Sequence, residues 1–189
     1  MKRSNLVSIT QAALAALLFG ASTPLAKLLL GEVDPVLLAA LLYLGSGISL
    51  AVIKLIQRTR SQPGSPEAPL IRQDVPWLLG AIFFGGIAAP ITLLFSLKST
   101  PAATSSLLLN FEGVATTLIA ALIFKEAVSR RAWVAVGLIT LAGILLSLNP
   151  GAGWGFSPGA LGIVIACGFW GLDNNFTRNI SARDPLTIV

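Results

Sequence analysis

The sequence contains no histidine, and its 189 residues include a single cysteine, Cys167. Without histidine the chain lacks the commonest general base, the commonest metal ligand and the side chain that ordinarily titrates near neutral pH. One cysteine can form no disulfide within the chain, and no residues show the spacing of a metal site. We therefore predict neither a metal nor a cofactor.

Charged residues are also scarce, at 11% of the chain, whereas soluble domains average about 25%. Hydrophobic residues make up 54%, and the mean hydropathy is +0.82. Such a chain cannot cover a surface that faces water, so we expect its partner to be a lipid bilayer. The net charge of +5 would also suit nucleic acid, but the basic residues lie between the apolar runs, so we predict no nucleic-acid binding.

Six apolar runs are present, each at or near the length that crosses a membrane. Backbone groups in lipid must bond within their own segment, and the runs show no period-2 alternation, so each is predicted to be a helix. The predicted fold is an all-α, polytopic transmembrane helix bundle. The runs cover residues 8–30, 35–56, 75–97, 101–124, 132–148 and 159–176.

Linkers rich in Lys and Arg alternate with linkers that have few. Of the thirteen Lys and Arg residues, all but Lys27 and Lys98 fall on the same predicted side of the membrane. This pattern predicts a multi-pass inner-membrane protein with a cytoplasmic amino terminus. Residues 58–74, rich in Pro and Ser, are predicted to be a mobile cytoplasmic loop. The amino end also loosely fits a signal peptide, but its apolar character continues to Leu30 and five further runs follow.

Run four carries one carboxylate, Glu112, about 17 Å along the predicted helix and therefore near the middle of the bilayer. A charge at that depth is expensive and by default indicates function. Ser105 and Thr116 share roughly the same helix face. A structural carboxylate that bonds to a neighbouring helix is the alternative.

Run six resembles run one at an offset of about 150 residues. Residues 18–20 (LFG) align with 169–171 (FWG), and 22–24 (STP) align with 173–175 (DNN). Five spans separate the copies, so the second enters the membrane from the opposite side, which indicates an inverted repeat. The chain ends where the second copy of run two would begin, so we expect a fragment lacking about four spans.

Helix breaks at matching places in two copies indicate a transport site. Pro24 and Pro90 are predicted to kink their helices. Asp173 and Asn174 would then line the site, or alternatively mark an ordinary helix end near the lipid headgroups. Trp170 would stack on a substrate, or serve as a packing or interface aromatic.

The chain resembles the EamA-domain transporters of the drug/metabolite transporter superfamily. The matching residues are Phe19-Gly20, 22–24, 102–103, 110–113 (NFEG) and 125–148. The resemblance implies a complete five-helix domain over residues 1–149 and the opening of a second over 150–189. It also implies ten helices in the family's full-length members and movement of small metabolites or drugs across the inner membrane.

We therefore expect a carrier, with export as its direction, that works by alternating access and is not an enzyme. Glu112 is the candidate for proton coupling or for recognition of a charged small-molecule substrate. The residues expected to line the path with it are Asn110, Thr23, Asp173, Asn174 and Trp170.

Two other classes stay open at this point. A membrane-embedded enzyme is disfavoured because the sequence shows no nucleophile–base pair, and residues 151–156 (GAGWGF) lack the Lys-Ser/Thr of a phosphate-binding loop. A non-transporting scaffold, or a half-length subunit that acts as a homodimer, is the other.

Overall fold

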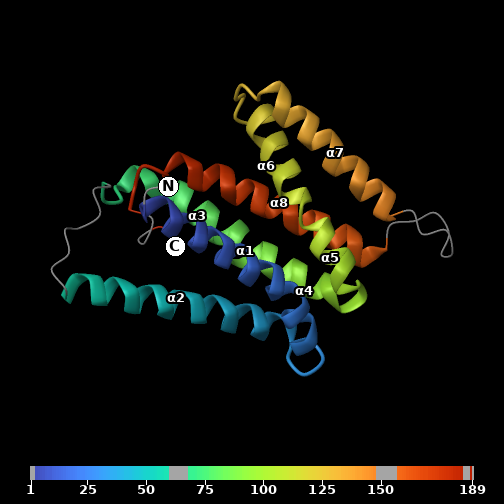
Figure 1. Ribbon diagram of the computed structural model, residues 1–189, viewed down its shortest axis with the longest axis horizontal. Helices are drawn as coiled ribbons and strands as arrows, with labels where there is room; N and C mark the ends of the chain where they lie inside the picture. Colours follow the sequence, from blue (N-terminus) through green and yellow to red (C-terminus); the bar gives the residue numbers. More distant parts are fainter. Residues whose placement is uncertain (1–2, 60–67, 148–156, 185–187, 189) are drawn as a thin grey trace.

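The computed structural model describes residues 3–59, 68–147, 157–184 and 188, and within them it contains helices and no β-strand (Figure 1). The elements are α1 (Arg3–Leu29), α2 (Pro35–Thr59), a 3₁₀ turn η1 (Arg72–Asp74), α3 (Val75–Ala81), a π-helical segment η2 (Ile82–Ala88), α4 (Ala89–Ser99), α5 (Ala102–Leu108), α6 (Phe111–Leu122), α7 (Arg130–Ser147) and α8 (Pro158–Asn179).

All six apolar runs are helical, within a few residues of the predicted bounds. By length and composition, four helical stretches of the described chain can cross a membrane: Ile9–Leu29, Pro35–Ile56, Arg72–Ser99 and Ala102–Leu122. The prediction of an all-α membrane bundle is confirmed. The division into two inverted copies stays a prediction.

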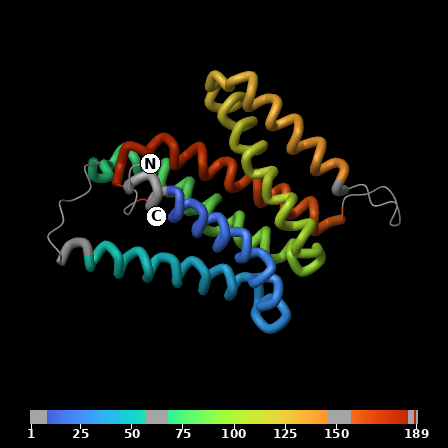
Figure 2. Tube along the Cα trace, viewed as in Figure 1, coloured from blue at the N-terminus to red at the C-terminus, as the bar shows by residue number. Residues whose placement is uncertain are grey.

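Helix α8 lies at the centre of the bundle (Figures 1 and 2). It packs on one side against the continuous α3–η2–α4 helix and on another against α6, which α7 covers from outside. Helix α1 packs mainly against α4 and α5, and α2 packs mainly against α4.

Two small apolar clusters fill the interior between these helices. One joins α1, α2 and α4 through residues such as Ala26, Leu38 and Leu97, and the other joins α5 to α8 through Leu108 and Ile163. Large apolar side chains on α1, α2 and α7 point outward instead. Contiguous apolar surface of this extent suits contact with lipid rather than water.

Run four is not the uninterrupted helix that its composition predicts. The helix breaks at Leu109 and Asn110, so α5 and α6 are separate segments. The amides of Asn110, Glu112 and Gly113 donate to carbonyls three residues earlier, at 3.0–3.2 Å. This tighter turn places Glu112 in the first turn of α6 rather than midway along one helix.

Run three changes helix type where proline was expected to bend it. The π-helical segment η2 ends at Ala88, and the amide of Ala89 donates to Phe84, five residues earlier. Pro90, which has no amide hydrogen, is buried in the following turn. Helix α1 runs through Pro24 without interruption, so a kink there stays a prediction.

Ion pairs fasten the end of α8 to its neighbours. Arg183 pairs with the buried Asp74 at 2.8 Å, and Arg178 pairs with Glu126. Glu126, which follows α6, is therefore joined to the last turn of α8. Part of the loop predicted over residues 58–74 lies outside the described residues, and its described end bridges to Arg183 through Ala68.

Helix α8 can approach α6 closely because residue 171 is glycine. A Cβ atom at Gly171 would lie 2.9 Å from the amide nitrogen of Thr116 and from the Cβ of Ala115. Such contacts are shorter than real Cβ atoms make, and backbone atoms cannot move aside cheaply. One turn earlier on the same helix, a Cβ at Gly168 would meet nothing within 4 Å.

Gly171→Ala should therefore destabilise the full-length protein by about 1–3 kcal/mol, the usual cost of overpacking. Gly168→Ala is the matched control and should leave stability unchanged or raise it, because alanine favours a helix by up to about 1 kcal/mol over glycine. Thermal unfolding in detergent measures both. Equal stability of the two variants would contradict the packing described.

Candidate functional site

A hydrogen bond inside the bundle joins Glu112 on α6 to Asn174 on α8. The side-chain amide of Asn174 donates to the Glu112 carboxylate at 2.9 Å and to the Thr116 hydroxyl at 3.1 Å. Both hydrogens of that amide are therefore used. A carboxylate, an amide and a hydroxyl from two different helices therefore meet here.

The break between α5 and α6 explains how Glu112 is held. Its side chain lies in the first turn of α6, where the positive end of the helix dipole stabilises a carboxylate. The carbonyls of Leu108 and Leu109 at this turn also face α8, although that of Leu109 already accepts from the amide of Glu112 at 3.0 Å. The Cys167 thiol donates to them at 3.6 and 3.7 Å.

Asn175, the next residue on α8, locks the two helices in register. Its side-chain amide is buried and donates to the backbone carbonyl of Thr116 at 3.1 Å and to that of Gly171 at 2.7 Å. A buried amide with both hydrogens bonded fixes the position of its helix. Asn174 is consequently presented to Glu112 rather than rotated away from it.

Asp173 lies on the other side of α8, against the π-helical segment. One carboxylate oxygen accepts a hydrogen bond from the Thr177 hydroxyl at 3.0 Å, and the other lies directly over Gly85. A Cβ at residue 85 would overlap that carboxylate, so a larger residue there would displace the Asp173 side chain. Asp173 and Asn174 thus both face neighbouring helices, and their place in a transport site stays a prediction.

Tyr43 and Trp170 complete the surroundings. The Tyr43 hydroxyl donates to the Gly85 carbonyl at 2.9 Å, and the Trp170 indole lies near that hydroxyl. Tyr43, Asp173 and Cys167 all lie near enough to the Glu112 carboxylate to experience its charge. Tyr43 was not among the residues expected here, and its signal in the sequence is that it is the chain's only tyrosine and stands in an apolar run.

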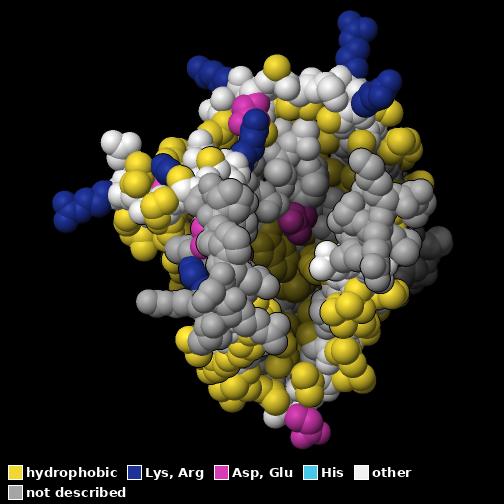
Figure 3. Space-filling view, turned by 60° about the vertical axis from the view of Figure 1, so that its left-hand side comes forward, with side chains coloured by type: hydrophobic (Ala, Val, Ile, Leu, Met, Phe, Trp, Pro, Cys, Tyr) yellow, Lys and Arg dark blue, Asp and Glu magenta, His cyan; other side chains and the backbone are white. Residues whose placement is uncertain are grey.

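The site is open to the outside of the described chain. Glu112 and Asp173 are partly exposed, Asn174 is exposed, and Tyr43 is 45% exposed. Figure 3 shows a hollow with largely hydrophobic walls and an acidic side chain within it. A small molecule could therefore reach polar groups of this kind without the helices unfolding.

Two further residues expected at the site lie elsewhere. Thr23 is buried in α1, which packs mainly against α4 and α5 rather than against α8. Asn110 is exposed, and its amide donates to the carbonyl of Leu107 at 2.9 Å, within its own turn. The structure thus brings together Glu112, Asp173, Asn174 and Trp170 but not Thr23 or Asn110.

No ion pair found among the described residues includes Glu112 or Asp173. In the same part of the chain, no three side chains of Asp, Glu, His or Cys gather as they would around a metal ion. What the arrangement offers chemically is two carboxylates that can each take a proton or pair with a cation, held by neutral donors.

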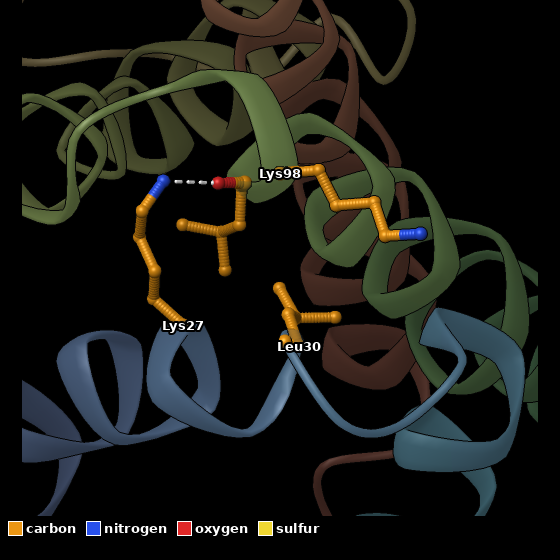
Figure 4. Close-up of a pocket in the computed structure, with 5 residues that line it drawn as sticks. Lys27, Leu30 and Lys98 are labelled. Carbon is orange, nitrogen blue, oxygen red and sulfur yellow. Dashed lines mark hydrogen bonds between the residues drawn. The ribbon is translucent and has the colours of Figure 1, made fainter.

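Away from these residues, a pocket of about 350 Å³ lies near the end of α4 and is lined by Lys27, Leu30, Gly31, Leu97 and Lys98 (Figure 4). The Lys27 ammonium donates to the Leu97 carbonyl at 2.5 Å and to the Thr100 carbonyl. These carbonyls belong to the last turn of α4, where a cation offsets the helix dipole. Lys27 thus has a structural role that accounts for its position.

The register of α6 against α8 predicts a specific cross-link. In a Cys167→Ser background, cysteines at Thr116 and Asn174 should form a disulfide on mild oxidation, because their side chains touch. A protease site inserted between Lys125 and Ser129 would show the bond as two fragments that separate only after reduction.

Thr117→Cys paired with Asn174→Cys is the matched control, because the Thr117 hydroxyl bonds to Gly113 in its own helix. Cross-linking of the control pair with equal yield, or of neither pair, would contradict this register.

Comparison with known proteins now places the chain. It is 29% identical to a protein described as "Uncharacterized transporter" from Methanothermobacter thermautotrophicus, over 93% of this chain and 54% of the relative. The chain thus spans about half the length of that relative. No solved structure shows significant similarity to it. Residues 6–148 match the EamA-like transporter family, and the chain belongs to that family.

Proposed function

We propose that this chain forms part of a secondary carrier that exports small metabolites or drugs across the inner membrane by alternating access. Its amino terminus lies in the cytoplasm, and Glu112 is the group that takes a proton or recognises a charged substrate. Family membership supports the transporter class, and the contacts of Glu112 support its role.

The observation that carries the proposal is the hydrogen bond from Asn174 to Glu112. A carboxylate among apolar helices is costly and is kept where it does work. A purely structural carboxylate would be surrounded and fully bonded, whereas Glu112 is partly exposed and bonds to one amide. A proton gained at Glu112 would weaken its hydrogen bond from Asn174, and loss of that proton would strengthen the bond. The contact between α6 and α8 would change accordingly.

Such a change in contact is what alternating access requires, because one group of helices must rock against another around the site. The π-helical segment η2 is suited to move, since π-helical turns are frequent at functional sites and hold their shape less firmly than an α-helix. The Tyr43 hydroxyl of α2 donates to this segment, and α8 packs against it. Motion of η2 would therefore change its contacts with both α2 and α8.

The two other classes of protein, a membrane-embedded enzyme and a non-transporting scaffold, gain no support from the contacts of Glu112. An enzyme of the membrane interior needs a nucleophile with a base beside it, whereas Glu112 accepts from the side-chain amide of Asn174, which also donates to the Thr116 hydroxyl. A scaffold has no need of a partly exposed carboxylate in its interior. The proposal therefore rests on Glu112 affecting flux.

The test is to express the full-length gene in a bacterial host and to compare metabolites in the medium with those of an empty-vector strain. The wild-type protein should raise the outside concentration of at least one compound. Glu112→Gln keeps the shape of the side chain but removes its charge, and it should lower that export rate about tenfold or more.

Glu126→Gln is the matched control, because Glu126 pairs with Arg178 at the end of the bundle and lies away from the site. It should export at close to the wild-type rate when present at the same level in the membrane. Export by Glu112→Gln that equals the wild-type rate would remove Glu112 from the mechanism.

A further inference from the structure

A group of basic side chains lies at the α6–α7 turn, residues 122–134, outside the site described above. Lys125 follows α6, and Arg130 and Arg131 begin α7. All three are exposed, and none takes part in an ion pair found among the described residues. From this group and the apolar side chains beside it, we propose that the α6–α7 turn binds the headgroup phosphate of an anionic phospholipid. This role goes beyond the proposed carrier function and does not depend on it.

The α6–α7 turn lies at the end of a stretch that can cross a membrane, because Ala102–Leu122 ends at its first residue. Figure 1 shows the turn at the tip of the hairpin that α6 and α7 form, away from α2. Apolar side chains beside the basic group point outward, with Leu122 72% exposed, Ile123 64% and Trp133 41%. Tryptophan is typical of the depth at which lipid headgroups lie. A phospholipid could therefore contact the basic group with its phosphate and the apolar side chains with its acyl chains.

The one acidic residue of the turn, Glu126, does not offset this positive charge, because it pairs with Arg178 of α8. The first turn of α7 contains no acidic residue, although two arginines are disfavoured at the positive end of a helix dipole. By contrast, Lys54 and Arg183 each have an aspartate partner. An anion from outside would therefore offset charge at the turn that these ion pairs leave in place, and anionic lipids attract basic residues next to a span.

The backbone at Lys125 supports a role for its side chain. Its φ of 54° lies in the left-handed region, which favours glycine. This conformation closes the end of α6, where the amide of Glu126 donates to the Ala120 carbonyl at 3.0 Å. Helices commonly end with a glycine in this conformation. A lysine there is costlier for the backbone than glycine, and residues held in such conformations cluster at functional sites.

Two phospholipids with the same acyl chains test the proposal on the wild-type protein. Dioleoyl phosphatidylglycerol carries a net negative charge, and dioleoyl phosphatidylcholine carries no net charge. The full-length protein in detergent is mixed with equal amounts of both, and native mass spectrometry counts the molecules of each lipid that stay bound. At least about tenfold more phosphatidylglycerol than phosphatidylcholine should be retained. Excess inorganic phosphate should not displace it, because phosphate makes no contact with the exposed apolar side chains.

Variants then locate the bound lipid. Arg131→Gln should lower the retention of phosphatidylglycerol about fivefold, since one basic residue near a membrane surface contributes a factor of that size. Arg72→Gln is the matched control, because Arg72 is also exposed but lies outside the α6–α7 turn, and it should leave retention unchanged. Lys125→Gly should also lower retention about fivefold. Its thermal stability should be unchanged or higher, because glycine adopts a left-handed φ without steric cost.

Equal retention of the two lipids by the wild-type protein would overturn the proposal. So would an equal loss in Arg72→Gln and Arg131→Gln, which would reflect the net charge of the protein rather than the α6–α7 turn. Displacement of the lipid by inorganic phosphate would also overturn it, because the turn would then take any phosphate anion. None of these measurements uses export, so failure of the lipid proposal and failure of the proposed carrier function are told apart.

Discussion

The interaction between Glu112 and Asn174 is the constraint on which the rest of the structure depends. It requires a carboxylate to be held among apolar helices, and it requires α6 and α8 to stay in one register. The surrounding chemistry meets both demands. The first turn of α6 stabilises the carboxylate, and Asn175 anchors α8 to the backbone of Thr116.

Close approach of the helices follows from the same requirement. Lipid supplies no hydrophobic drive between apolar helices, so small residues and interhelical hydrogen bonds must hold them together. Gly171 lets α8 touch α6, and Gly85 leaves room for the carboxylate of Asp173 against the π-helical segment. The glycines and the polar residues of α8 therefore act together, because a larger side chain at either glycine would move the carboxylates apart.

Much of the fold could be predicted from the sequence, because length and hydropathy decide which segments can be helices in lipid. Length and hydropathy do not show where a single helical turn changes its hydrogen-bond pattern. The break before Glu112 and the π-helical segment depend on contacts with α8, which composition does not contain. Among the site residues, Glu112 and Asn174 stand out as polar groups in apolar runs. Tyr43 does not, because a tyrosine in a membrane span is ordinarily an interface or packing residue.

A carrier of the proposed kind requires the residues around Glu112 to face water inside the membrane rather than lipid. Labelling in native membranes with a membrane-impermeant maleimide measures this directly, in a Cys167→Ser background of the full-length protein. A cysteine at Asn174 should react readily, whereas a cysteine at Leu138, an outward-facing position on α7, should not. A cysteine at Asn174 that is as unreactive as the one at Leu138 would contradict the account.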